Sequence, residues 1–294
     1  MNSPVLLLTF NRPQFTGRVL EAIRKARPSR LFVSSDGPRQ DVPREKESVR
    51  ETRNLIDGAV NWPCEVYTRF LDTNHGCRVG VSSAISWFFE HVKEGIILED
   101  DCLPHPDFFP YCDQLLQRYR NEPSVMAISG DNSAGVSISG EASYAFARQP
   151  LVWGWATWLR AWEHYDDRLD GWKALRRNQS KKREIWPDRA ERRWQSRNLD
   201  RLLYSNKPDS WAYRWSFSVE SLGGLCAVPA VNLVSNIGFG PAGTHTRNAT
   251  HARANAPTLP ILPLTHPPRL RRDPELERQI YAYAHEGAVR RNPL

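Results

Sequence analysis

Three consecutive carboxylates, Glu99, Asp100 and Asp101, are the residues of this sequence best suited to metal binding or acid–base chemistry. They follow Gly95–Leu98, which has the length of a strand and the unbroken apolar character of a parallel strand covered on both faces. Adjacent carboxylates repel one another, and a divalent cation such as Mn²⁺ or Mg²⁺ would relieve that repulsion while binding phosphate oxygens. A solvated acidic turn before a helix explains the same residues, so both interpretations stay open.

Polar residues also follow earlier apolar runs. A first predicted strand ends beside Phe10 and Arg12, and a second ends near Asp36. Asn74 and His75 lie in the loop before a later predicted helix. Because the carboxyl ends of parallel strands meet at one edge of a sheet, we expect these five residues to lie near the three carboxylates. An Asx turn at Asp36 and loop capping by Asn74 and His75 are the structural alternatives.

The order of the predicted elements indicates what would position these residues. Predicted strands alternate with predicted helices along residues 4–10, 13–26, 31–33, 41–57, 64–70, 79–91 and 95–98. This alternation is typical of a parallel sheet with right-handed crossover connections. We therefore predict an α/β fold with a Rossmann-like, mostly parallel central sheet that is flanked by helices.

Tryptophans crowd into residues 152–162 in the second half of the chain. Trp158 and Trp162 are four residues apart, which predicts one packed face of a helix. Trp153 and Trp155 flank a glycine and could instead form the floor of a sugar site, because aromatic faces stack on sugar C–H groups. Core packing explains this second pair equally well.

Nucleotide binding would have to come from side chains at strand ends. The sequence contains no G-x-x-x-x-G-K-[ST] motif, and no G-x-G-x-x-G motif follows the first predicted strand. Asp36 could accept the N–H of a pyrimidine ring, with Arg12 beside the base. Glu99 and Asp100 would face the sugar and ribose, and Asp101 would bind a metal ion that neutralises a diphosphate leaving group.

The net charge of +7 comes from one segment. Residues 173–197 contain ten Lys or Arg and three Asp or Glu, so the rest of the chain is balanced. Such a block is most often one solvated face of a helix. The alternatives are an anionic acceptor and peripheral contact with an anionic membrane surface. We expect no nucleic-acid partner, because no motif of that class accompanies the block.

The cysteine content and the apolar runs of the sequence bear on the cellular compartment of the protein. The five cysteines lack metal-ligand spacing, which argues against a zinc site or a disulfide framework and favours a reducing cytoplasm. The apolar run at residues 5–8 is too short for a signal sequence or a membrane span. We expect a cytoplasmic protein, with the inner face of the membrane as an alternative.

Seven short motifs carry a resemblance over nearly the whole chain. They are Phe10-Asn-Arg-Pro13, Ser35-Asp36-Gly-Pro-Arg39, Glu99-Asp100-Asp101, Pro106-Asp-Phe-Phe-Pro-Tyr111, Ile128-Ser-Gly-Asp-Asn132, Trp153-Gly-Trp-Ala-Thr-Trp158 and Asn232-Leu-Val-Ser-Asn-Ile-Gly-Phe-Gly240. In this order and spacing they resemble bacterial GT-A glycosyltransferases of family 2 type, often labelled hemolysin-like. The chain is more distantly similar to eukaryotic N-acetylglucosaminyltransferase I.

The resemblance implies a GT-A fold and a metal-dependent, inverting enzyme. It would move a hexosyl or N-acetylhexosaminyl group from a nucleotide-diphosphate donor, expected to be a UDP-sugar, to a hydroxyl of a carbohydrate or glycoconjugate acceptor. By the same resemblance Arg12 and Asp36 would contact the uracil, and Asp101 would bind Mn²⁺ or Mg²⁺. We also assign His245 as a candidate metal ligand.

The same resemblance suggests a division of the chain. Residues 1–101 would form the nucleotide-binding half and residues 102–250 the acceptor half of a single transferase domain. Residues 251–294 would follow as a proline-rich strap and a final helix.

The catalytic base is where this sequence departs from the family pattern. Family members tend to have Trp-Asp-Tyr-Gln-Trp, whereas this chain has Trp211-Ala-Tyr-Arg-Trp215, so the expected carboxylate is absent. An inverting displacement still needs a group that accepts the proton of the acceptor hydroxyl. We assign that role to Asp209, with Asp131 and Glu220 as weaker candidates, and we place Glu99 with it among the catalytic residues.

Two other functions compete with this prediction. A sugar nucleotidyltransferase also joins an α/β sheet to acidic metal ligands, but it usually has a Gly-rich N-terminal loop, which residues 10–13 do not provide. A catalytically silent sugar-nucleotide or carbohydrate-binding protein would retain the cleft, and Ala212 makes that alternative conceivable.

Overall fold

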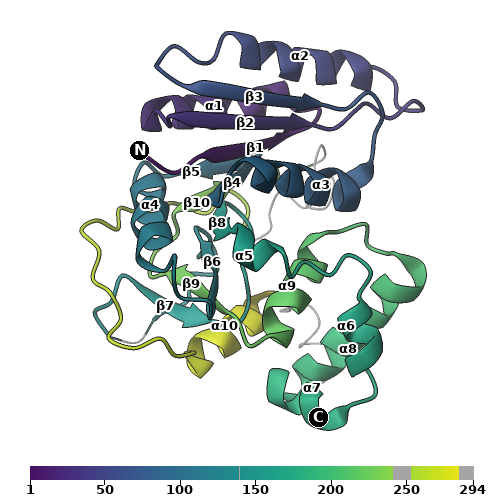
Figure 1. Ribbon diagram of the computed structural model, residues 1–294, viewed down its shortest axis with the longest axis vertical. Helices are drawn as coiled ribbons and strands as arrows, with labels where there is room; N and C mark the ends of the chain where they lie inside the picture. Colours follow the sequence, from purple (N-terminus) through teal and green to yellow (C-terminus); the bar gives the residue numbers. More distant parts are fainter. Residues whose placement is uncertain (139, 241–252, 285–294) are drawn as a thin grey trace.

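The computed structural model describes residues 1–138, 140–240 and 253–284 (Figure 1). Strands and helices alternate strictly in the first third of the chain: β1 (Val5–Thr9), α1 (Pro13–Ala26), β2 (Arg30–Ser35), α2 (Glu45–Asp57), β3 (Glu65–Phe70), α3 (Gly76–His91) and β4 (Glu94–Glu99). These seven elements agree with the predicted ones in type and order, and their ends differ by a few residues.

The rest of the described chain is less regular. Its elements are β5 (Cys102–Pro104), α4 (Phe108–Arg118), β6 (Val125–Ser129), β7 (Tyr144–Ala147), β8 (Trp155–Trp158), α5 (Leu159–Trp162), α6 (Asp170–Leu175), α7 (Gln179–Ile185), α8 (Arg189–Ser205), α9 (Ala212–Ser221), β9 (Leu225–Pro229), β10 (Val234–Asn236) and α10 (Pro274–Ala284).

One mixed sheet organises the molecule. Its eight strands lie in the order β3-β2-β1-β4-β8-β6-β9-β7, and β10 pairs with β5 in a separate two-stranded sheet. The pairs β1–β2, β1–β4, β2–β3 and β6–β9 are parallel, whereas β8 runs antiparallel to both of its neighbours and β7 to β9. The predicted α/β class with a mostly parallel sheet is therefore confirmed.

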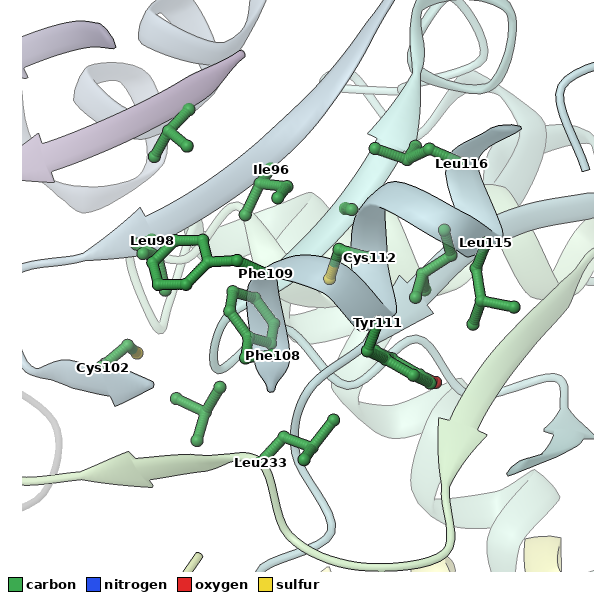
Figure 2. Close-up of a cluster of buried hydrophobic side chains, with 14 of the residues drawn as sticks. Ile96, Leu98, Cys102, Phe108, Phe109, Tyr111, Cys112, Leu115, Leu116 and Leu233 are labelled. Carbon is green, nitrogen blue, oxygen red and sulfur yellow. The ribbon is translucent and has the colours of Figure 1, made fainter. Parts of the chain in front are cut away.

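Helices bury both faces of this sheet. All five residues of β1 are buried, which fits the prediction of apolar strands covered on both sides. On one face the helices α1 and α4 pack against the sheet, and Figure 2 shows α4 beside Ile96 and Leu98 of β4. On the other face the packing comes from α3, α9 and α10, through residues such as Phe88, Trp215 and Leu276.

The tryptophan-rich segment differs from the prediction. Trp158 ends the strand β8, and Trp162 ends the short helix α5, so the two residues do not share one helix. The prediction of a shared helix face was wrong because buried residues four positions apart also occur where a strand leads directly into a helix. Both side chains are nevertheless buried, as expected for core residues.

The basic segment is helical, as predicted. The helices α6, α7 and α8 lie together away from β1–β3 (Figure 1), and they enclose a small core of their own with Trp172, Trp186 and Leu199. No helix in the described part of the chain is both long enough and apolar enough to cross a membrane.

Candidate functional site

A cavity of about 450 Å³ opens at the carboxyl ends of β1, β2 and β4. Nine residues that the sequence analysis singled out line it: Phe10, Arg12, Asp36, Asn74, Glu99, Asp100, Asp101, Trp153 and Asp209. The side chain of His75 is exposed and Trp155 is buried in the core, and neither residue lines the cavity. His245 lies outside the described residues.

Strand register brings the first of these residues together. Leu8 of β1 is paired with Glu99 of β4, and Thr9 is paired with Ser35 of β2, so the three strands end at nearly the same level. Since the strands are parallel, the residues that follow them all emerge at one edge. Pro13 begins α1 immediately afterwards, which fixes Arg12 at the N-cap position of that helix.

The three carboxylates lie in a buried, strongly negative environment. Oδ2 of Asp100 accepts the backbone N–H of Phe10 at 3.2 Å, and this side chain is almost fully buried. Burial raises the pKa values of Glu99 and Asp100, the negative charge of Asp101 raises them further, and Arg12 opposes the effect. A cation in the cavity would therefore stabilise the ionised forms of these groups.

Arg12 supplies a positive charge at this position. Its Nη1 lies 2.7 Å from Oδ2 of Asp101 and 3.7 Å from Oδ1 of Asp100. Burial lowers the pKa of Arg12, but the two carboxylates outweigh it and the pKa lies above its ordinary value. The guanidinium therefore stays positively charged where it lies between the acidic residues.

Asp36 joins the end of β2 to the loop before α3. Its Oδ1 accepts the N–H groups of Gly37 and His75, both at 2.9 Å. Its Oδ2 accepts the side-chain amide of Asn74 and the N–H of Gly76, both at 3.1 Å. A carboxylate has about four lone-pair sites, so a nucleobase would have to share an oxygen that already accepts bonds from the protein. His75 contributes through its backbone.

Asp209 reaches the same cavity from the loop before α9. Its Oδ2 accepts the N–H of Arg78 at 3.4 Å, and its Oδ1 lies 4.0 Å from Nε of Arg78. That buried Nε has no hydrogen-bond partner among the described residues. Gly76 has a φ of 76° and leaves room for the carboxylate, because a Cβ there would lie 2.6 Å from Oδ2 of Asp209.

The N-terminus of α3 is therefore satisfied by two carboxylates from other parts of the chain. The preceding residue, His75, makes no side-chain capping bond. Instead Asp36 bonds the N–H of Gly76, and Asp209 bonds the N–H of Arg78. The positive end of a helix attracts carboxylates, so the start of α3 holds both Asp36 and Asp209.

The other candidate bases lie in different surroundings. Ala212, the first residue of α9, is absent from the cavity lining. Asp131 is buried and pairs with Arg253 at 2.8 Å. Glu220 is buried and accepts the indole N–H of Trp186.

Trp153 and Trp155 have separate environments. Trp153 lines the cavity, with the guanidinium carbon of Arg253 3.9 Å from its ring centroid. Trp155 is only 1% exposed and stacks on Trp211 at a centroid distance of 5.6 Å. Of the two interpretations that the sequence left open for these residues, core packing describes Trp155, and Trp153 is the one of the pair that lines the cavity.

Sequence reasoning missed two residues that shape the acidic end of the cavity. Asn236, the last residue of β10, lines the cavity and its Oδ1 accepts the N–H of Gly238 at 2.9 Å. Gly238 packs so closely on Asp101 that a Cβ would lie 2.1 Å from Oδ2. The repeated glycines of residues 236–240 were the available signal, since glycine marks close approach of a backbone.

Asp101 is the side chain best placed for a metal ion. The described residues contain no cluster of three or more His, Cys, Asp or Glu arranged around one metal position. Asp101 offers hard carboxylate oxygens at the cavity, already within 2.7 Å of a cationic group. A single carboxylate of this kind fits a Mn²⁺ or Mg²⁺ ion whose other ligands would be substrate phosphates and water, as is common for Mg²⁺.

Comparisons with known proteins leave the family open. No family model and no curated protein matches the chain. Among solved structures, HddC from Yersinia pseudotuberculosis matches with 12% identity over 49% of this chain and 59% of its own, at a TM-score of 0.30. S. aureus TarS 1–349 matches with 13% identity over 54% of this chain and 47% of its own, at a TM-score of 0.35. A cytidylyltransferase from Leptospira borgpetersenii matches with 10% identity over 62% of this chain and 74% of its own, at a TM-score of 0.36. The chain thus spans less than two thirds of the first two proteins, and function must be argued from the site.

Proposed function

We propose that the protein is a metal-dependent glycosyltransferase that transfers a sugar from a nucleotide-diphosphate donor to a hydroxyl acceptor with inversion. The observation that carries this proposal is the convergence of Asp101, Arg12 and Asp209 on one cavity at the carboxyl edge of a parallel sheet. This edge is where open α/β sheets bind nucleotides. The expected donor is a UDP-sugar.

The nucleotide end of the donor would occupy the part of the cavity formed by Phe10, Asp36 and Asn74. The Phe10 ring has the guanidinium of Arg39 5.7 Å from its centroid, which places an aromatic face and a cation on one wall. Bonds from the 74–76 loop hold Asp36 in a fixed orientation, and a base N–H would share one of the oxygens that accept these bonds.

The diphosphate would lie at the acidic end, beside Asp101. A bound Mn²⁺ or Mg²⁺ would act as a Lewis acid and neutralise the charge that develops on the departing diphosphate. Asp101 would hold the ion, and Arg12 would then release Asp101 and turn toward phosphate oxygens, for which guanidinium geometry is well suited. Gly238 keeps the space beside Asp101 open for this exchange of partners.

Asp209 would accept the proton of the acceptor hydroxyl. Its carboxylate lines the cavity, where the backbone N–H of Arg78 at the start of α3 holds it, and a general base must lie within reach of the acceptor hydroxyl. Proton transfer to an oxygen of Asp209 leaves the acceptor oxygen free to attack the sugar carbon opposite the leaving group. Trp153 offers a ring on which the transferred or accepting sugar could stack.

A sugar nucleotidyltransferase is the second candidate. The guanidinium of Arg12 lies inside the cavity after the first strand, and a guanidinium there would bind the phosphates of either kind of substrate. The missing Gly-rich loop argues against a nucleotidyltransferase. A protein that binds sugar nucleotides without turnover remains the third alternative, since Ala212 stands where the family pattern has a carboxylate.

Incubation with a panel of sugar nucleotides and Mn²⁺ separates the three functions. A transferase releases the nucleoside diphosphate by slow hydrolysis or by transfer, and EDTA stops the release. A parallel incubation with nucleoside triphosphates and sugar 1-phosphates detects a nucleotidyltransferase, which joins the two substrates into a sugar nucleotide and releases pyrophosphate. Binding of a donor without either product would identify the silent alternative and contradict the proposal.

A further inference from the structure

Four arginines form a continuous row along the exposed face of α8. Arg189, Arg193, Arg197 and Arg201 follow one another at intervals of four residues, and all four side chains are exposed. Residues four apart lie on nearly the same side of a helix, so this arginine stripe is about 18 Å long at a rise of 1.5 Å per residue. We propose that the arginine stripe binds the surface of an anionic lipid bilayer.

The arginine stripe has no paired carboxylate among the described residues. The ion pairs of this region join Lys173 to Asp170, Lys181 to Glu184, Arg176 to Asp200 and Arg148 to Glu191. None of the four stripe arginines forms an ion pair with a carboxylate in the described part of the chain. Like charges at a spacing of four residues destabilise a helix, so the stripe weakens α8 unless negative charges approach it from outside.

The opposite face of α8 holds the stripe in place. Leu199 and Leu202 are buried in the small core of this region. Near the start of the helix, Glu191 is buried and receives two hydrogen bonds from the buried guanidinium of Arg148, at 3.1 and 2.6 Å. This helix therefore presents its charges on a fixed support, and the arginine side chains alone need to adjust to a partner.

The shape and composition of this surface favour a bilayer over a polymer. The stripe lies on the exposed face of a single helix whose other face packs into the small core, and such a face fits a planar surface. Tyr204 is 67% exposed at the end of the same helix. Tyrosine is favoured at the boundary between lipid and water, and arginine is attracted to anionic headgroups. The inference uses charge and exposure only and does not depend on the proposed function.

Vesicle sedimentation tests the inference directly. The protein should bind phosphatidylcholine vesicles that contain phosphatidylglycerol, bind vesicles of phosphatidylcholine alone much more weakly, and dissociate as salt is raised. Arg193→Gln/Arg197→Gln should lower partitioning at least tenfold, because each basic residue near an anionic leaflet contributes about fivefold. Lys46→Gln/Arg50→Gln on α2 removes the same charge from an exposed helix with acidic neighbours and should leave binding unchanged.

Three results would overturn the inference. They are equal binding to neutral and anionic vesicles, unchanged partitioning of the stripe variant, and an equal loss in the α2 control. A fourth would reassign the surface: tighter binding to duplex DNA than to anionic vesicles at the same salt would make nucleic acid the partner. Misfolding cannot mimic the expected result, because glutamine keeps the helix propensity and removes repulsion, so the melting temperature of the stripe variant should not fall.

Discussion

Nη1 of Arg12 lies 2.7 Å from Oδ2 of Asp101, between carboxylates that would otherwise repel one another at the end of β4. The pair has two consequences. It lets three adjacent acidic residues be buried at a sheet edge, because an unpaired buried carboxylate is very costly. It also places a protein cation at the carboxylate proposed to hold the metal ion, so on that proposal the two would compete for Asp101.

Removal of the Arg12 charge should strengthen metal binding. In the donor-free protein, Arg12→Gln leaves Asp101 without its guanidinium partner, and the affinity for Mn²⁺ should rise several-fold. Titration followed by electron paramagnetic resonance measures free Mn²⁺ directly. Arg24→Gln on the exposed face of α1 is the matched control and should have no effect. An unchanged or weaker Mn²⁺ affinity in Arg12→Gln would show that no such competition exists.

Loss of the Asp209 carboxylate should slow the reaction and leave donor binding intact. Asp209→Asn keeps the size of the side chain but cannot accept a proton, so kcat should fall by about 10²–10⁴. Donor affinity, measured by calorimetry, should change by less than about twofold, because an acceptor-side base does not bind the nucleotide. Asp167→Asn removes another carboxylate that bonds Arg78 and serves as the control.

The same reasoning applies to Ala212. Since residue 212 is not part of the cavity lining, Ala212→Asp should not raise activity. A kcat of Asp209→Asn close to that of the wild type, or a large gain from Ala212→Asp, would assign the base elsewhere.

Asp36 should matter for local stability as well as for nucleotide choice. Asp36→Asn replaces one carboxylate oxygen by an amide nitrogen, and a nitrogen in place of Oδ2 cannot accept the bonds from Asn74 and Gly76. We expect the free energy of unfolding to fall by about 1–3 kcal/mol, because two partly buried donors lose their acceptor. UDP should bind the wild type better than CDP, and the difference should disappear in the variant. Asp72→Asn in the same exposed loop should change neither quantity.

Chemical denaturation measures the loss of stability, and calorimetry measures the preference for UDP over CDP. If Asp36→Asn unfolds at the same denaturant concentration as the wild type, the bonds to the 74–76 loop do not hold it. If UDP and CDP bind the wild type equally, Asp36 does not read the base.

Glu220 should make stability depend on pH. Burial raises the pKa of Glu220 to about 7, against the opposing charge of Arg148 and the bond from Trp186. The folded state therefore holds the proton more tightly than the unfolded chain, and stability falls as pH rises from about 4.3 toward 7. Each unit of difference between the two pKa values corresponds to about 1.4 kcal/mol. Glu220→Gln, which stays neutral, should lose less stability over this range.

Urea denaturation at about pH 5 and about pH 8 measures the difference between the two proteins at each pH. Glu184→Gln on the exposed face of α7 is the control and should follow the wild type. Identical losses of stability in Glu220→Gln and the wild type would mean that Glu220 is not protonated in the folded protein.

The side of the cavity that follows strands β1 and β2 was the part that sequence patterns could predict. Apolar runs set the strands, and Pro13 set the start of α1, so the positions of Phe10, Arg12 and Asp36 after their strands could be read directly. The parallel register of the strands then aligns those positions, so no side-chain contact has to be known in order to predict this alignment.

The side of the cavity that contains Trp153 and Gly238 depends on pairings between distant segments, and local sequence patterns do not encode these pairings. Strand β8 runs antiparallel between β4 and β6, which places Trp153 at the cavity and Trp155 in the core. Gly238 meets Asp101 because β10 pairs with β5. Both contacts follow from sheet topology, and alternation or helical spacing within one segment cannot reveal them.

The affinity of UDP with and without Mn²⁺, compared between the wild type and Asp101→Asn, tests the central claim most directly. If Asp101 holds a metal ion against the donor diphosphate, Mn²⁺ should tighten UDP binding to the wild type at least tenfold in calorimetry. Asp101→Asn should bind UDP with the same affinity in Mn²⁺ and in EDTA. Asp57→Asn, an exposed change of the same kind at the end of α2, should behave as the wild type. Equal UDP affinity of the wild type in Mn²⁺ and in EDTA, or a full Mn²⁺ effect in Asp101→Asn, would contradict the account.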